Sequence, residues 1–170
     1  VIDTLQHAEI KDILVVTGGA REEVESIAAK YDVRTIFNED FARGEMLSSI
    51  QVGVRALSPL SLSGRGAGGE GQTANAILVI LGDQPQIQER SVRAVASRFE
   101  ETRANLIVPS YQMRRGHPWL VARPFWEEII AMRAPESPRD FLNRHASEIE
   151  YVTVDNPSIL SDLDTPDDYL

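Results

Sequence analysis

One stretch near the middle of the chain limits the fold more than any other. Residues 76–81 read Ala-Ile-Leu-Val-Ile-Leu, and Gly82-Asp83-Gln84-Pro85 follows directly. Six apolar residues without polar alternation predict a strand that is buried on both faces, as in the middle of a parallel sheet. Because ligands in open α/β sheets bind beyond the carboxyl ends of the strands, Asp83 stands where a functional carboxylate is expected. The alternative is an ordinary turn, since Gly, Asp and Pro are common turn formers.

Size and charge narrow the class of protein. The 170 residues suffice for one domain with a hydrophobic core and are too few for two ordinary domains. A formal charge of −9 disfavours nucleic acid as a partner, whereas a nucleotide carried with a divalent cation remains compatible. The absence of cysteine excludes disulfides and a cysteine nucleophile. No apolar run reaches the roughly 18 residues of a membrane span, so we expect a cytoplasmic protein without a membrane partner.

Strand and helix patterns alternate along the chain. Apolar runs predict strands, and apolar residues at helical spacing predict the helices between them. The predicted strands are 13–17, 34–37, 76–81, 106–109, 119–122 and 149–154, and the clearest helical stripes lie in 1–8, 24–31, 46–57 and 92–99. Such alternation favours a mainly parallel sheet with helices on both faces, a three-layer α/β/α fold. Residues 58–75, rich in Gly and Ser, match neither pattern and predict a flexible loop.

Two groups of polar residues stand at the ends of predicted elements. Ser48 and Ser49 lie in the first turns of a predicted helix, where serine caps the helix, faces solvent or points at a ligand. Near the C-terminus, Asp162 and Asp164 alternate with Leu163, so in an extended segment both carboxylates share one face, about 7 Å apart. Asp164 also suits the N-cap of a closing helix, a role that does not account for Asp162.

Five short motifs occur in a familiar order along nearly the whole chain. They are Val15-Val16-Thr17-Gly18, Asn38 with Gly44 and Ser48-Ser49, Leu81-Gly82-Asp83-Gln84-Pro85, Gly116-His117-Pro118 and Asp162-Leu163-Asp164-Thr165-Pro166-Asp167-Asp168-Tyr169. Through them the chain resembles the MobA-like NTP transferases, and most of all the subgroup of molybdenum cofactor cytidylyltransferases. The resemblance implies a Rossmann-like sheet of the nucleotide-diphospho-sugar transferase, or glycosyltransferase-A, type.

The resemblance also implies a reaction and the residues that serve it. A terminal phosphate of molybdopterin, or of its metal-bearing form, would attack the α-phosphorus of CTP and release pyrophosphate, with Mg²⁺ as cofactor. Asp83 would be catalytic and a metal ligand, and Asp162 and Asp164 are the further candidate ligands. The implied nucleotide site comprises Asn38, Gly44, Ser48, Ser49, Gly82 and Asp83, and the implied acceptor site comprises His117, Arg114 and Arg115.

Each of these roles has a structural alternative. His117 could be a satisfied structural histidine, and Arg114 and Arg115 could be solvated loop charges. His7 and His145 lie in helical patterns without a motif and are interpreted as surface or packing residues.

One family feature is absent from the sequence. Members of the family begin with an apolar strand and Leu-Ala-Ala-Gly-x-Ser-x-Arg-Met-Gly, a turn that wraps the triphosphate, with a Lys a few residues on. The sequence starts inside the helix that should follow, which predicts one N-terminally truncated domain over 1–170 without its first strand. Either these residues exist in the native protein and are missing from this chain, which we favour because Asp83 and the C-terminal carboxylates have no obvious purpose without a nucleotide, or the chain is a truncated relative that cannot bind CTP in the family way. Besides cytidylyl transfer, two functions stay open: a non-catalytic accessory protein that delivers the cofactor to a molybdenum hydroxylase apoenzyme, and transfer with another nucleotide or acceptor.

Overall fold

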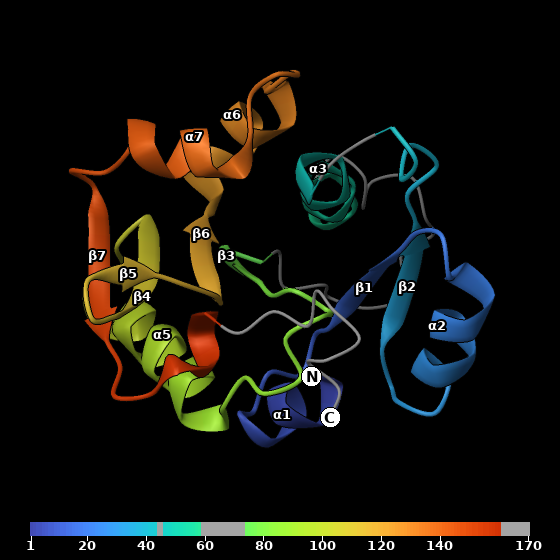
Figure 1. The fold of residues 1–170 in the computed structure, drawn as a ribbon, viewed down its shortest axis with the longest axis horizontal. Helices are drawn as coiled ribbons and strands as arrows, with labels where there is room; N and C mark the ends of the chain where they lie inside the picture. The colour runs from blue at the N-terminus through green and yellow to red at the C-terminus, as the bar shows by residue number, and fades with distance from the viewer. Residues whose placement is uncertain (44–45, 59–73, 161–170) are drawn as a thin grey trace. The chain divides into compact units, whose positions relative to one another are not determined.

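The structure, a computed structural model, describes residues 1–43, 46–58 and 74–160 (Figure 1). Its contacts divide the chain into two compact units, each assembled from stretches that are distant in sequence. Unit 1 contains Val1–Lys11, Ala76–Ala122 and the described residues from 147 onward; unit 2 contains the described residues between 12 and 75 together with Arg123–Ala146. None of the described helices combines the length and the apolar character needed to cross a membrane.

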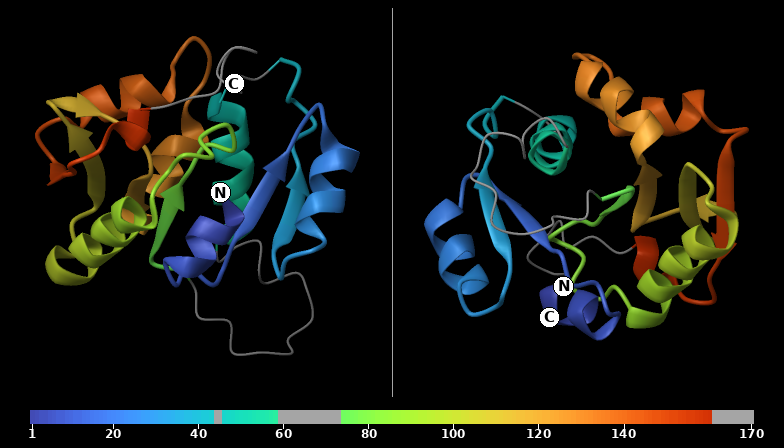
Figure 2. Two further views of the ribbon diagram at one scale, coloured as in Figure 1. Left: turned by 60° about the horizontal axis from the view of Figure 1, so that its bottom comes forward. Right: turned by 180° about the vertical axis from the view of Figure 1, so that it is seen from behind.

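Unit 2 is built around a parallel pair of strands. β1 pairs with β2 from Leu14 opposite Arg34 to Thr17 opposite Phe37, and α2 connects the two strands. Figure 2 shows α2 and α3 on opposite sides of this pair. The elements of unit 2 are β1 (Leu14–Thr17), α2 (Arg21–Ala28), β2 (Arg34–Phe37), α3 (Met46–Leu57), η1 (Arg123–Phe125), α6 (Trp126–Ala131) and α7 (Pro138–Arg144). The predicted βαβ arrangement is confirmed in this unit.

The sequence explains why the helices of unit 2 form where they do. α3 buries Leu47, Ile50 and Val54, whose spacing of three and four residues places them on one face. α7 begins with a capping box, in which the Ser137 hydroxyl and the Asp140 carboxylate each accept from the other residue's backbone N–H. The predicted apolar stripe of α2 is only partly buried, because Ala28 is 1% exposed and Ile27 is 53% exposed.

Unit 1 contains a five-stranded sheet in the order β3-β6-β4-β5, with β7 also paired to β4. In Figure 1, α5 lies against this sheet. Val95 of α5 forms a buried apolar cluster with Ile107, Leu120 and Val152 of the sheet. The elements are α1 (Ile2–His7), β3 (Ala76–Val79), α5 (Glu89–Thr102), β4 (Leu106–Tyr111), β5 (Arg114–Arg115), β6 (Trp119–Ala122), β7 (Ile149–Thr153) and η2 (Pro157–Leu160).

The central apolar run differs from its sequence-based prediction. β3 covers Ala76–Val79, its residues are half-buried, and it pairs antiparallel with β6. The pairs β4–β6 and β4–β5 are also antiparallel, whereas β4–β7 is parallel. The α/β class is therefore confirmed, with strand directions more mixed than expected. A tight turn at Gln112-Met113 explains why β4 and β5 are antiparallel, because two-residue turns join antiparallel strands only.

His145 is a packing residue, as its position in the sequence suggested. Its ring lies 4.5 Å from the Phe125 ring and 4.9 Å from the Phe141 ring, measured between centroids. Its Nε2 lies 2.9 Å from Oε2 of Glu128. The other carboxylate oxygen of Glu128, Oε1, accepts a 2.6 Å hydrogen bond from Arg144. Partial burial acts to raise the pKa of Glu128, but the hydrogen bonds from His145 and Arg144 outweigh it and hold the pKa below its usual value.

Replacing Glu128 by Gln should make the melting temperature less sensitive to acid. Because the pKa of Glu128 is lower in the folded state, its carboxylate stabilises the fold above the unfolded-state pKa. This contribution is lost as the pH falls through the folded-state pKa, so the wild-type melting temperature should drop between roughly pH 5 and pH 3. Thermal unfolding across this range should show a shallower drop for Glu128→Gln. Glu127→Gln, which changes an exposed neighbour, is the control and should follow the wild type.

Candidate functional site

Three residues implied around a nucleotide are in contact in unit 2. Asn38 follows β2 and is 1% exposed, whereas Ser48 and Ser49 lie in the first turn of α3 and are half-buried. The side-chain amide of Asn38 donates to the Ser48 hydroxyl at 2.9 Å and to the Ser49 hydroxyl at 3.1 Å. Its carbonyl oxygen accepts from the backbone N–H of Asp40 at 3.1 Å. Asn38 thus ties the loop after β2 to the start of α3 through the two serine hydroxyls.

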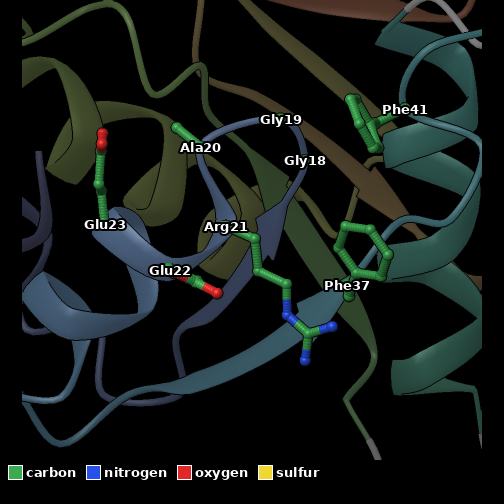
Figure 3. A pocket seen from close by; sticks show the side chains of 8 residues that line it. All are labelled: Gly18, Gly19, Ala20, Arg21, Glu22, Glu23, Phe37 and Phe41. Carbon is green, nitrogen blue, oxygen red and sulfur yellow. The ribbon is translucent and has the colours of Figure 1, made fainter.

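A pocket adjoins this loop at the carboxyl ends of β1 and β2. Its volume is about 360 Å³, near the lower end of the range for small-molecule sites. The guanidinium of Arg21 lies 4.6 Å from the ring centroid of Phe37, and the two side chains lie together in Figure 3. The lining residues are Gly18, Gly19, Ala20, Arg21, Glu22, Glu23, Phe37 and Phe41. No motif in the sequence was interpreted as part of this pocket, although Gly18-Gly19 after an apolar strand was the signal that could have indicated it.

Removing the Asn38 side chain should destabilise unit 2. Asn38→Ala leaves the two serine hydroxyls without the amide donor and the Asp40 N–H without its acceptor, in a nearly fully buried position. We expect a loss of about 1–3 kcal/mol in the free energy of unfolding, measured by urea denaturation. Asn105→Ala, at an exposed position before β4, should change it by less than about 0.5 kcal/mol. Equal losses in the two variants would contradict the structural role of Asn38.

In unit 1, His117 contacts two segments that precede other motifs in the sequence. Its backbone N–H donates to the carbonyl oxygen of Ile159 in η2 at 2.9 Å, and its Nδ1 lies 3.3 Å from the carbonyl oxygen of Val79 at the end of β3. Because a carbonyl oxygen can only accept, the second contact places the proton of a neutral ring on Nδ1. The half-buried ring also lies 6.0 Å from the Trp119 ring. His117 therefore has the contacts of a structural histidine, next to the strand that precedes Gly82-Asp83.

Asp83 occupies an exposed turn with Gly82, four residues past Val79, the last residue of β3. The Asp83 carboxylate makes no hydrogen bond or ion pair with the part of the chain that the structure describes. A Cβ atom added to Gly82 would meet nothing within 4 Å, so this turn is open. Gly82-Asp83 therefore forms a turn, and this turn carries an exposed carboxylate beyond a strand.

The two arginines implied at the acceptor site differ in their surroundings. Arg114 is exposed on β5, whereas Arg115 is half-buried and donates from Nε to the Tyr151 hydroxyl at 2.8 Å. The Arg115 guanidinium also lies 5.7 Å from the centroid of the Tyr151 ring. Arg115 is thus fixed against β7, while Arg114 is the more exposed cation of the pair.

The metal site implied by the resemblance is only partly within the described residues. Asp162 and Asp164 lie outside them, as do Gly44 and most of the 58–75 loop. Among residues 1–43, 46–58 and 74–160, no group of three or more potential ligand side chains could hold a metal ion. The exposed carboxylate oxygens of Asp83 are the kind of ligand that suits Mg²⁺ or Mn²⁺, which bind proteins through one or two carboxylates. The described segment of η2 ends at Leu160, directly before the segment with Asp162.

Comparison with known proteins places these features in a family. Residues 1–149 match the family described as the MobA-like NTP transferase domain. A molybdenum cofactor cytidylyltransferase of Escherichia coli (strain K12) is 29% identical over 161 residues, which are 93% of this chain and 72% of that protein.

Solved structures agree on the fold. A crystal structure of Rv0371c from Mycobacterium tuberculosis H37Rv superimposes with a TM-score of 0.76 at 24% identity, covering 99% of this chain and 78% of that one. A second structure of this protein, in complex with manganese, gives a TM-score of 0.71 at 21% identity over 99% and 81% of the two chains. The Rossmann-like α/β fold expected from the sequence is thereby confirmed. The chain belongs to the MobA-like NTP transferase family and is a nucleotidyltransferase.

Proposed function

We propose that the protein transfers CMP from CTP to a terminal phosphate of molybdopterin or of the molybdenum cofactor, with release of pyrophosphate. The similarity to the molybdenum cofactor cytidylyltransferase over 93% of the chain supports this assignment. The observation in the structure that supports it most is the pair of His117 contacts, because they join Gly116-His117-Pro118 to the strand before Gly82-Asp83 and to the helix before Asp162. The Gly116-His117-Pro118 motif and the strand that leads to Gly82-Asp83 thus belong to neighbouring segments of unit 1.

The residues of the chain act in this reaction by binding and orienting. Transfer of a nucleotidyl group requires in-line placement of the acceptor oxygen and the α-phosphorus, and little covalent help from the protein. The proposed nucleotide residues are Asn38, Gly44, Ser48, Ser49, Gly82 and Asp83. In the described contacts, Asn38 orients the hydroxyls of Ser48 and Ser49, which can then donate to ribose or base.

On the acceptor side, we propose His117, Arg114 and Arg115. With its proton on Nδ1, the His117 ring presents Nε2 as a hydrogen-bond acceptor. Arg114 is the exposed cation that can meet a phosphate, and Arg115 is held in place by its bond to the Tyr151 hydroxyl.

A divalent cation fits the carboxylates of the proposed site. Asp83 is the proposed catalytic residue and would hold the cation, with Asp162 or Asp164 as second ligand, and the proposed ion is Mg²⁺. Bound there, the cation would neutralise the negative charge that grows on the phosphate oxygens. The manganese complex of Rv0371c, a chain with the same fold, is consistent with a divalent metal in the family.

We propose that the reaction takes place in the cytoplasm and that a molybdenum hydroxylase apoenzyme receives the cytidylylated cofactor. A non-catalytic accessory protein that holds the cofactor is the second candidate function. It is favoured by the internal hydrogen bonds of Asn38, which satisfy its amide without a nucleotide.

Pyrophosphate release from CTP in the presence of molybdopterin and Mg²⁺ tests the proposal on the full-length gene product. Release that needs both the acceptor and the metal supports cytidylyl transfer. Turnover with GTP but not CTP would overturn the choice of nucleotide. Cofactor binding without any turnover would favour the accessory protein.

A further inference from the structure

Gln51 connects two helices of unit 2 that are far apart in the sequence. Its side-chain amide nitrogen lies 2.9 Å from the carbonyl oxygen of Ile129, 3.4 Å from that of Ile130 and 3.0 Å from that of Met132. These carbonyls stand at the C-terminal end of α6, where the last turn of a helix has no intrahelical donors for all of its carbonyl oxygens, and they also accept from Arg133, Arg55 and the Met132 backbone N–H. The half-buried amide of Gln51 therefore joins α3 to the end of α6 as one of several donors there.

The same helix carries the serines of the proposed nucleotide site. Ser48 precedes Gln51 by three residues, so the two side chains lie on one face of α3, about one turn apart. Because a helix moves as a rigid element over so short a distance, a displacement of α3 at Gln51 also displaces the Ser48 and Ser49 hydroxyls. These hydroxyls accept from the Asn38 amide at 2.9 and 3.1 Å, a geometry that a shift of one ångström would disrupt.

We propose that Gln51 is a positioning residue of the nucleotide site: its hydrogen bonds to the end of α6 hold Ser48 and Ser49 in register with Asn38. The role in nucleotide binding rests on the proposed function, whereas the coupling from Gln51 to Asn38 does not depend on it. No motif pointed to Gln51 in the sequence, because its partners lie 78 to 81 residues further along the chain.

Arg55 offers a matched control on the same helix. Its guanidinium donates to the Ile130 carbonyl at 3.3 Å, so it also connects α3 to the end of α6. Arg55 is exposed and lies one turn further from the serines than Gln51 does. A residue that only stabilises the helix pair should affect stability alone, and Arg55 represents this case.

Hydrogen exchange of the Asn38 side-chain amide, followed by NMR, tests the coupling directly. Gln51→Leu keeps most of the side-chain volume and removes the donor. We expect the Asn38 amide protons to exchange about tenfold faster in this variant, as for the loss of about one hydrogen bond. Arg55→Gln should leave the rate within about twofold of the wild type, and Gln51→Lys, whose ammonium can donate to the same carbonyls, should restore it. If Gln51→Leu does not fold, Gln51→Asn replaces it in the experiment. Its side chain is one methylene shorter, which moves the amide donor away from the α6 carbonyls.

CTP affinity of the full-length protein, measured by calorimetry, is the second readout. The dissociation constant should rise about tenfold in Gln51→Leu and stay unchanged in Arg55→Gln. Unchanged exchange or unchanged CTP affinity in Gln51→Leu would overturn the inference, as would an equal effect of Arg55→Gln. A wild-type protein that does not bind CTP would instead overturn the proposed function, and the exchange rates would still decide whether Gln51 positions Asn38.

Discussion

Replacing Asp83 by Asn is expected to reduce nucleotidyl transfer by on the order of 10²–10³-fold while leaving the fold intact. The carboxylate lies in an exposed turn and has no partner among the described residues, so its loss removes no contact of the fold. Asparagine keeps the shape of the side chain but lacks the negative charge that holds a divalent cation. The rate of pyrophosphate release and the melting temperature, measured on the same preparation, separate the two effects.

Asp32→Asn is a suitable control for this experiment. Asp32 is another exposed aspartate in a bend, and the resemblance gives it no role. The free energy of unfolding of both variants should lie within about 0.5 kcal/mol of the wild-type value. Only Asp83→Asn should lose activity. If Asp83→Asn keeps full activity, Asp83 is not the metal ligand. Binding of the cofactor by Asp83→Asn, together with an inactive wild type, would favour the accessory protein.

Gly116→Ala should be among the most destabilising single substitutions in unit 1. A Cβ atom at Gly116 would lie 2.2 Å from the carbonyl oxygen of Ile159 and 2.8 Å from its carbonyl carbon. Both are backbone atoms, so the contact cannot be relieved by rotating a side chain. The substitution therefore has to push η2 away and weaken the His117 N–H bond to Ile159. We expect a loss of about 1–3 kcal/mol or more in the free energy of unfolding, measured by urea denaturation.

Gly82→Ala is the matched control, because a Cβ atom there would meet nothing within 4 Å. Its effect on stability should be below about 0.5 kcal/mol. Neither glycine has a positive φ, so the comparison separates lack of space from backbone strain. A Gly116→Ala variant as stable as the wild type would show that η2 can move away from Gly116 at little cost.

Prediction from the sequence was most accurate for local structure. Strand β2 was predicted at its observed bounds, and α3 was predicted from the spacing of Leu47, Ile50 and Val54. Such elements depend on residues that are near one another along the chain, so their pattern is visible in the sequence. The motifs also indicated the correct family, because their order along the chain is itself a property of the sequence.

Prediction was least accurate where the neighbours of a segment decide the outcome. The apolar run 76–81 was expected to be a buried parallel strand, but β3 is half-buried and antiparallel to β6. The sequence of a strand does not specify the direction of its partner or whether both of its edges are covered. Ile27 is another example: it fits the apolar stripe of α2, yet it is 53% exposed.

For the candidate site, the sequence was enough to propose residues that could carry chemistry: the carboxylate of Asp83, the amide of Asn38, the serine hydroxyls and the ring of His117. Which of these side chains bond to other parts of the protein became visible in the fold. Asn38 is tied to both serines, His117 to β3 and η2, and Asp83 is left exposed in its turn. The reason is physical, since hydrogen bonds and close contacts depend on distances through space between segments that the chain separates by tens of residues.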